Sequence, residues 1–219
     1  MDFTNFETVS LIQLASPLNS KKIYKTQLKN LTASPTSQAH FDNHYKTDQV
    51  YWPEIYSLPF QCTIESKLRS FQFKMNHNIV FTNERLFRYN MVASNLCTFC
   101  KGDVETVDHL FVSCIYVKLL WDKIVSELLL PYGIHNIPTE NVILGFYKDE
   151  QNGGQSLPNH IIFSATYFIY KCKLMQKIPN WYDFKFKLKD LEYIERQIAM
   201  RKGKLDHHNR KWDPLAIFW

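Results

Sequence analysis

The middle of the chain is organised by one stretch, Leu96-Cys-Thr-Phe-Cys-Lys-Gly-Asp-Val-Glu-Thr-Val-Asp-His-Leu-Phe-Val-Ser-Cys114. It contains three cysteines and one histidine in a C-x2-C-x8-H-x4-C pattern: Cys97, Cys100, His109 and Cys114. Three thiolates and one imidazole form a closed tetrahedral ligand set for Zn²⁺, and two cysteines separated by two residues can bind one ion from a single turn. Because four protein ligands leave no position open for a catalytic water, the pattern predicts a structural zinc ion.

The spacing of the last two candidate ligands also predicts local structure. His109 and Cys114 are five residues apart, which turns them about 140° from each other on an ideal helix. One unbroken helix cannot present both to a single ion, so the helix that begins near Thr106 is expected to loosen or break around Ser113-Cys114. The Lys101-Gly102 step suits the first turn, since glycine accepts the positive φ that such a turn often needs. The alternative interpretation is a set of ordinary buried cysteines beside an unrelated histidine.

Length and composition indicate a globular protein. The 219 residues are 45% hydrophobic and 15% aromatic, which is enough to build a core, and six glycines and nine prolines argue against a disordered or fibrous chain. The zinc pattern uses three of five cysteines as thiolates, which favours a reducing compartment over a disulfide framework. We find neither a secretion signal nor an apolar run of about eighteen residues. We therefore expect a soluble intracellular protein of the nucleus and/or cytoplasm, with no membrane partner.

The positive charge is concentrated near the C-terminus. Residues 165–211 contain twelve Lys and Arg against five Asp and Glu, a net charge of +7, whereas the whole chain carries +5. Such a segment is where a binding surface for a polyanion would be sought. A solvated helix face is the alternative explanation.

The N-terminal part gives weak helical signals. Helical spacing predicts a short helix over 21–31, and the polar, aperiodic stretch 31–48 is interpreted as a linker. Trp52-Pro53 is expected to start a helical turn that Leu58-Pro59 ends.

Stronger periodicity begins at Thr63. This residue is an acceptable N-cap for a helix whose apolar positions recur at intervals of four, three and four residues: Ile64, Leu68, Phe71 and Met75. A second helix is expected after Thr82, with Leu86 and Phe87 facing inward. Beyond the zinc pattern, apolar residues keep helical spacing through Trp121, which is most simply a core residue.

Two long helices are predicted in the C-terminal part, after a loop over 149–158. They cover 159–176 and 181–201, with Asn180 as the N-cap of the second. The tail that contains His207-His208 and Trp212 is expected to be loosely held, and its adjacent histidines are not assigned to a metal.

The central part of the chain resembles the reverse-transcriptase zinc-binding domain, which lies near the C-terminal end of the polyprotein of LINE-type, non-LTR retrotransposons. The resemblance extends over about 50–215 and is most specific over 68–121. It rests on Phe71-Gln-Phe-Lys-Met-Asn-His-Asn-Ile-Val-Phe-Thr-Asn, Arg85-Leu-Phe, Leu96-Cys-Thr-Phe-Cys, Glu105-Thr-Val-Asp-His-Leu-Phe, Cys114 and Trp121.

The resemblance implies a binding module that helps to hold template RNA or target DNA, with the reverse transcriptase domain of the same element as a further partner. We do not expect an enzyme, because the chain has neither the Asp-Asp pair of the family's polymerase nor a zinc-deaminase signature. Asp103, Glu105 and Asp108 near the zinc pattern would repel phosphate, so contact is expected from basic residues of the flanking helices. The candidates are Lys74, Arg85, Arg88, Lys171, Lys173, Lys177, Lys185, Arg201 and Lys202.

Two alternatives stay open. In the first, the apolar stripes of the last two helices pack on the polymerase in a protein-interaction or scaffold module. In the second, the chain is an element remnant without a function. In each case the predicted fold is mostly α-helical, with helical segments flanking a small CCHC zinc knuckle. The predicted division is an N-terminal linker segment (1–60), a helical zinc-binding domain (61–130) and a basic helical C-terminal region (131–219).

Overall fold

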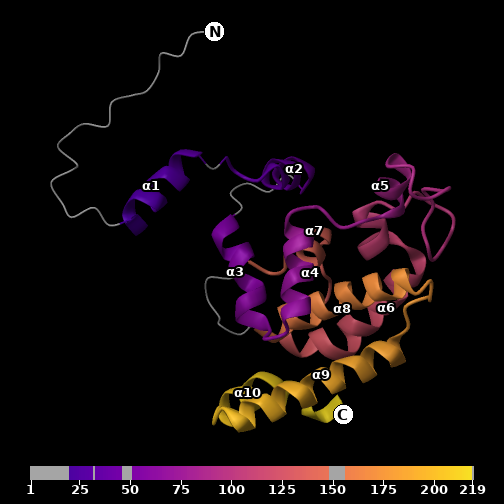
Figure 1. The fold of residues 1–219 in the computed structure, drawn as a ribbon. Coiled ribbons are helices and arrows are strands. Elements are labelled where there is room, and N and C mark those ends of the chain that lie inside the picture. The colour runs from indigo at the N-terminus through magenta and orange to yellow at the C-terminus, as the bar shows by residue number, and fades with distance from the viewer. Residues whose placement is uncertain (1–19, 32, 46–50, 148–155, 219) are drawn as a thin grey trace. The chain divides into compact units, whose positions relative to one another are not determined.

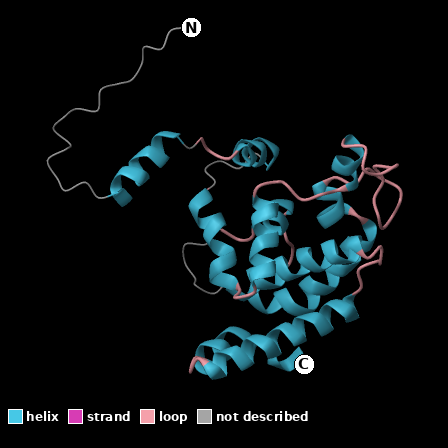
Figure 2. Cartoon of the chain, in the orientation of Figure 1, coloured by secondary structure: helices cyan, strands magenta, loops and turns pink. Residues whose placement is uncertain are grey.

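The computed structural model describes residues 20–31, 33–45, 51–147 and 156–218. These residues form helices and loops and no named strand, as Figure 2 shows; the one β-type pairing among them is an isolated bridge between Leu96 and Val104. The chain divides into two compact units, Met1–Pro35 and Thr36–Trp219. The first contributes helix α1 (Ser20–Leu31), which confirms the short helix predicted there.

The second unit is built from helices throughout its described part, which confirms the mostly α-helical fold class. Two π-helical turns, at His109–Ser113 and Val125–Leu129, and two 3₁₀ turns, at Leu130–Tyr132 and Asp213–Phe218, interrupt or extend the α-helices. The α-helices are α2 (Thr36–Tyr45), α3 (Trp52–Cys62), α4 (Ser66–Asn76), α5 (Asn83–Arg88), α6 (Ile115–Ile124), α7 (Thr139–Leu144), α8 (Ser156–Leu174), α9 (Trp181–Arg201) and α10 (Leu205–Trp212).

Helix α8 is the centre of this unit. It contacts α3, α4, α7, α9 and α10, and Figure 1 shows it running through the group of helices, with α9 along the outside. Its first half is buried on nearly all sides, as expected for a helix covered all round, and Ile161, Ile162 and Phe163 are fully buried. Gly145, between α7 and α8, has a φ of 82°, and a Cβ atom there would lie 2.8 Å from the Phe163 ring. Glycine therefore allows the two helices to approach.

The predicted end of α3 at Leu58-Pro59 is wrong, because the helix continues to Cys62 with Pro59 inside it. A proline within a helix leaves the carbonyl four residues earlier without its usual donor. Here that carbonyl belongs to Ile55, and it accepts a long hydrogen bond of 3.5 Å from Asn76 Nδ2 on α4. Pro59 is itself buried, so tertiary contacts support the irregular turn.

The predicted linker over 31–48 is also wrong for its described part, since α2 occupies Thr36–Tyr45. This helix has little amphipathic pattern. Phe41 is 2% exposed and its ring stacks on Trp52, while the Tyr45 hydroxyl donates to Asp108 Oδ1 at 2.9 Å and Gln38 Nε2 donates to the Tyr56 hydroxyl at 3.1 Å. A polar segment held by one buried ring and by hydrogen bonds to distant residues gives no periodic signal in the sequence.

Three smaller expectations fail at the surface and at the tail. Ile64 precedes α4 and is 47% exposed, and Phe87 on α5 is 46% exposed and not directed inward. The tail is not loosely held: it forms α10, where His208 and Trp212 are buried. The predicted core positions Leu68, Phe71, Met75 and Trp121 are buried as expected.

The domain boundaries stay a prediction. The boundary at 60/61 falls within α3, and the boundary at 130/131 falls within the 3₁₀ turn Leu130–Tyr132. Both lie inside the second compact unit. None of the described helices is both long enough and apolar enough to span a bilayer.

Candidate metal centre

The first two candidate ligands lie on a tight loop, residues 96–105, which we call the ligand loop. The isolated bridge between Leu96 and Val104 closes this loop, and Cys97 N–H donates to the Asp103 carbonyl at 2.8 Å. The left-handed residue of the turn is Lys101, with a φ of 58°, and not Gly102 as the sequence suggested. A Cβ atom on Gly102 would meet nothing closer than 4.0 Å. A side chain at position 102 would therefore fit in the available space. It is Lys101 that adopts the left-handed conformation, which is uncommon for residues other than glycine.

The other two candidate ligands lie at either end of an irregular turn. Residues His109–Ser113 form a π-helical turn, and Cys114 leaves the helical region with φ −59° and ψ 132° before α6 begins at Ile115. The Cys114 N–H donates to the His109 carbonyl at 2.9 Å, five residues back. The predicted break around Ser113-Cys114 is confirmed. Its effect is to direct both side chains to the same point.

The four candidate ligands converge. One ligating atom from each of Cys97, Cys100, His109 and Cys114 lies within 4.8 Å of the others. The Sγ atoms of Cys97 and Cys114 are 3.8 Å apart, and Cys100 Sγ is 3.3 Å from His109 Nε2. Zinc–sulfur bonds of about 2.3 Å in a tetrahedron place two sulfurs about 3.8 Å apart. The sulfur spacing therefore fits a tetrahedral zinc ion, and it is far too long for a disulfide.

Outer groups orient the histidine ring. His109 Nε2 faces the sulfurs, while Nδ1 faces Ser113 Oγ at 3.4 Å and Asp103 Oδ2 at 3.8 Å. A metal-binding histidine usually uses its second nitrogen in this way, which fixes the ring orientation. Thr106 Oγ1 also accepts from the His109 backbone N–H at 3.0 Å. The imidazole is thus pre-positioned with Nε2 as its ligating atom.

The electrostatics of the thiols suit a cation. Burial raises the pKa of Cys97 to about 12 and also raises the pKa of Cys114. Burial acts in the same direction on Cys100, but backbone hydrogen bonds from Asp103 and Gly102 outweigh it and lower the pKa of that thiol to about 6. Thiolates are the ligand form, so a divalent cation would supply the charge that the two buried sulfurs need to ionise.

A buried ion pair between Glu105 and Lys173, which the sequence analysis did not predict, supports the loop. Glu105 is fully buried; its Oε1 accepts from Asn83 N–H at 2.8 Å and its Oε2 from Thr98 N–H at 2.6 Å. Lys173 Nζ on α8 lies 3.2 Å from Glu105 Oε1 and donates to Asn83 Oδ1 at 3.0 Å. The pair joins the ligand loop to α5 and α8. One feature of the sequence could have predicted the burial of Lys173: it lies four residues after the apolar Ile169, and so on the same, inward side of α8.

The candidate nucleic-acid contacts divide into two groups. Lys173 is 7% exposed and paired with Glu105, so its assignment as a phosphate contact is corrected. Arg85 is half-buried and donates to the carbonyls of Asn78 and Val80, so it holds the preceding loop. Arg88 is exposed and pairs with Glu84 at 3.0 Å. The remaining candidates are exposed, or half-buried in the case of Lys185: Lys74, Lys171, Lys177, Lys185, Arg201 and Lys202.

Two of these lysines lie in one groove. Lys74 on α4 and Lys171 on α8 line a hollow of about 510 Å³ together with Lys67, Tyr167 and Tyr170. The other lining residues are Ser66, Ser70, Phe71 and Leu174. We call this hollow the α4–α8 groove.

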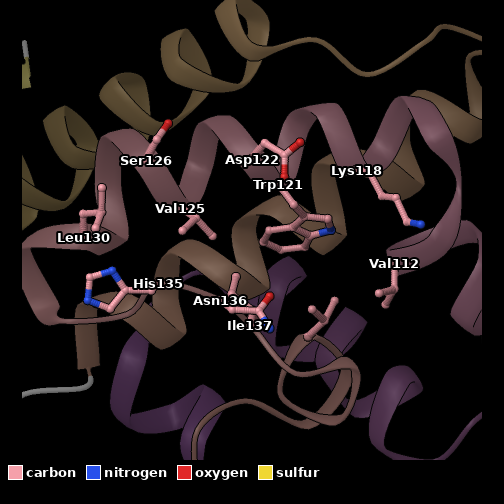
Figure 3. Close-up of a pocket in the computed structure, with 11 residues that line it drawn as sticks. Val112, Lys118, Trp121, Asp122, Val125, Ser126, Leu130, His135, Asn136 and Ile137 are labelled. Carbon is pink, nitrogen blue, oxygen red and sulfur yellow. The ribbon is translucent and has the colours of Figure 1, made fainter.

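A separate cavity of about 620 Å³ lies beside α6 (Figure 3). The Trp121 indole forms part of its wall, and Trp121 Nε1 donates to the Phe111 carbonyl at 2.7 Å, so the ring is fixed. Figure 3 shows His135 and Lys118 towards opposite ends of the cavity. None of the four candidate metal ligands lines it.

Comparison with known proteins agrees with this geometry. Residues 36–121 match the family described as zinc-binding in reverse transcriptase, and all four candidate ligands lie within that range. Over 84 residues the chain is 29% identical to an Arabidopsis thaliana protein named "Putative ribonuclease H protein"; the match covers 36% of this chain and 13% of that protein. The chain thus corresponds to a small part of the length of this relative. The match over residues 36–121 agrees with the resemblance that the residue pattern indicated.

Proposed function

We propose that this chain is a nucleic-acid-binding module whose fold is organised by a structural zinc ion, and that it derives from a LINE-type, non-LTR retrotransposon. Cys97, Cys100, His109 and Cys114 would hold the ion. A closed set of four ligands gives the metal an architectural role and no open coordination position. The binding of nucleic acid is assigned to the flanking helices.

The observation that carries the proposal is the α4–α8 groove. Lys67, Lys74 and Lys171 surround it, and no acidic residue lines it. A cluster of lysines on adjacent helices suits the phosphate backbone, which dominates the affinity of proteins for RNA and DNA. Burial raises the pKa of Tyr167, and the charge of the Glu65 carboxylate raises it further, so one negative charge lies near the edge of the groove.

Aromatic rings form the floor of the groove. The Phe71 ring centroid is 5.2 Å from that of Tyr167 and 5.2 Å from that of Tyr170. Lys187 on α9 lies over the Tyr167 ring, with its Nζ 5.7 Å from the ring centroid, and adds another cation beside the groove. Packed rings would give the groove a fixed shape, and the long side chains of the exposed Lys67, Lys74 and Lys171 could adjust to phosphates.

The metal centre and the groove share a helix. Lys173, which pairs with Glu105 of the ligand loop, lies two residues after Lys171 on α8. Loss of zinc would release the ligand loop and remove a buried partner from α8. A metal far from the phosphates can therefore be required for binding without touching the nucleic acid.

The test is nucleic-acid binding by the zinc-loaded chain, measured by fluorescence anisotropy between about 50 and 200 mM salt. We expect steep salt dependence, and we expect Lys74→Ala/Lys171→Ala to reduce the slope of log affinity against log salt by roughly one per lost phosphate contact. Lys118→Ala/Lys123→Ala, two exposed lysines of α6, is the matched control and should leave the slope unchanged. Binding that does not respond to salt, or equal slopes for both double variants, would contradict the proposal.

A second candidate function is protein interaction through the surface around α5. Phe81, Phe87, Tyr89 and Met91 are between 46% and 68% exposed, which leaves a group of apolar side chains in one segment. The reverse transcriptase domain of the same element is the partner that the resemblance implies. The apolar positions of α9 that the sequence analysis offered for packing on the polymerase give less support, because Phe184, Leu188 and Leu191 are buried within this chain.

A further inference from the structure

One face of α9 carries aromatic and basic side chains directed away from the core. It consists of residues at intervals of four and three, which place them on one side of the helix: Tyr182, Phe186, Lys189, Tyr193, Arg196 and Met200. We call it the α9 stripe. Its apolar members are strongly exposed, Tyr182 at 81%, Phe186 at 75%, Tyr193 at 57% and Met200 at 53%.

The stripe is not a by-product of core packing. The buried residues of the same helix, Phe184, Leu188 and Leu191, lie on the opposite side and account for the attachment of α9 to the rest of the unit. Single exposed apolar residues are normal on a protein surface. A line of three aromatic rings and one methionine extends over about 27 Å at 1.5 Å per residue, and such continuity indicates a binding surface.

The charge on the stripe is of one sign. Lys189 and Arg196 lie between the apolar residues, and Lys185 flanks them. At 100° per residue, none of the four acids of α9 falls within the stripe: Asp183, Asp190, Glu192 and Glu195. Glu192 pairs with His208 at 3.5 Å, and Glu195 is buried against Lys211 at 2.9 Å. A second copy of this stripe would meet it with like charges, whereas a polyanion with flat bases complements it.

We infer that the α9 stripe binds single-stranded nucleic acid, with bases stacked on Tyr182, Phe186 and Tyr193 and phosphates held by Lys189 and Arg196. This inference rests on the proposed function and adds a preference for single strands. Aromatic platforms flanked by cations are the usual means of binding single strands. Tyr182 and Phe186 are separated by about 6 Å along the helix axis, more than the 3.4 Å rise of stacked bases. The stripe thus suits splayed bases, which a duplex does not offer.

A hollow beside the stripe adds depth to the surface. It has a volume of about 440 Å³ and is lined by Lys189, Tyr193 and Arg196 of the stripe together with Trp212 of α10. Glu192, which pairs with His208, and Asp213 also line it, so the hollow is of mixed charge and phosphate is expected on the stripe beside it, at Lys189 and Arg196.

The test compares single-stranded and duplex oligonucleotides of about 16 nucleotides, in RNA and DNA forms, against the full zinc-loaded chain. Tyr182→Ala/Phe186→Ala/Tyr193→Ala should weaken single-strand binding by at least about fivefold per ring, with duplex binding unchanged. The ring-preserving variant Tyr182→Phe/Phe186→Tyr/Tyr193→Phe should bind single strands as the unmodified chain does. Photocrosslinking of an oligonucleotide containing 5-iodouracil should label residues of the stripe.

Several results would overturn the inference. They are equal single-strand affinity in the alanine variant and the unmodified chain, equal losses for single strands and duplex, and failure of the ring-preserving variant to retain binding. Dimer dissociation or loss of anionic-vesicle binding in the alanine variant, without a change in oligonucleotide affinity, would assign the stripe to another partner. Duplex binding that depends on Lys74 and Lys171, without any effect of the stripe, would leave the proposed function standing. Absence of all nucleic-acid binding would contradict both the proposed function and this inference.

Discussion

Replacing Lys173 with methionine should destabilise the protein by about 3–5 kcal/mol, because it leaves a buried carboxylate without its counter-ion. Glu105 is fully buried and Lys173 is 7% exposed, so water cannot replace the lost ammonium group without a rearrangement. The carboxylate would keep its hydrogen bonds from Asn83 N–H and Thr98 N–H, at 2.8 and 2.6 Å. Those two bonds explain why we expect a loss of stability and not a complete failure to fold.

The magnitude can be measured by urea unfolding at pH 7 with zinc present, and zinc content should be checked in parallel. For a unit of this size the expected loss corresponds to a fall in Tm of roughly 6–20 °C. The matched control is Lys171→Met on the same helix, where the side chain is exposed, and its effect should stay within about 0.5 kcal/mol.

A double-mutant cycle separates the ion pair from simple loss of packing. Glu105→Gln/Lys173→Met removes both charges, so it should be less destabilised than the sum of its single variants by about 0.5–3 kcal/mol. The pair does not stabilise the ligand loop as described if the free energy of unfolding of Lys173→Met lies within about 1 kcal/mol of that of the unmodified protein. The same conclusion follows if the destabilisations of the two single variants sum to that of the double variant.

Two further predictions concern the metal ligands and the core. Cys100→Ser should abolish stoichiometric zinc, measured by elemental mass spectrometry, and lower the free energy of unfolding by several kcal/mol, up to on the order of 10. The control is Cys172→Ser, which changes a buried cysteine outside the cluster and should keep one zinc per chain. Normal thermal stability of Cys100→Ser would contradict the zinc assignment. Burial, reinforced by the Lys211 ammonium, holds the pKa of His160 well below its usual value. The unfolded chain therefore takes up a proton there as pH falls below about 6.5, and His160 should cost about 1.4 kcal/mol of stability per pH unit below that point, until its folded pKa is reached. Urea unfolding at a series of pH values should show a shallower acid slope for His160→Gln, and identical slopes would show that His160 is not protonated on unfolding.

The sequence alone determined the features that depend on short-range spacing. The four ligands and the break near Ser113-Cys114 follow from which residues can reach one ion from a helix of fixed pitch. The N-cap at Asn180 is equally local, and its side chain accepts from Asp183 N–H at 2.9 Å as expected. The long helices α8 and α9 were visible because their apolar residues recur along one chain segment.

Tertiary structure decided what depends on residues distant in the sequence. Helix α2 is attached by contacts with distant residues, of Phe41 with Trp52 and of Tyr45 with Asp108. Helix α3 continues through Pro59, where Asn76 donates to the Ile55 carbonyl. The tail is held as helix α10 by contacts with three distant helices. Lys211 Nζ donates to the Cys62 carbonyl on α3, to His160 Nδ1 on α8 and to Glu195 Oε2 on α9.

The same distinction applies to charge. In the sequence, Lys171 and Lys173 are two lysines near the end of one predicted helix, and both were predicted to contact phosphate. In the folded chain Lys171 lines the α4–α8 groove, whereas Lys173 is buried against Glu105, 68 residues earlier in the chain. Local spacing fixes the face of a helix on which a residue lies. Whether that face meets water or a buried carboxylate depends on the packing of the whole unit.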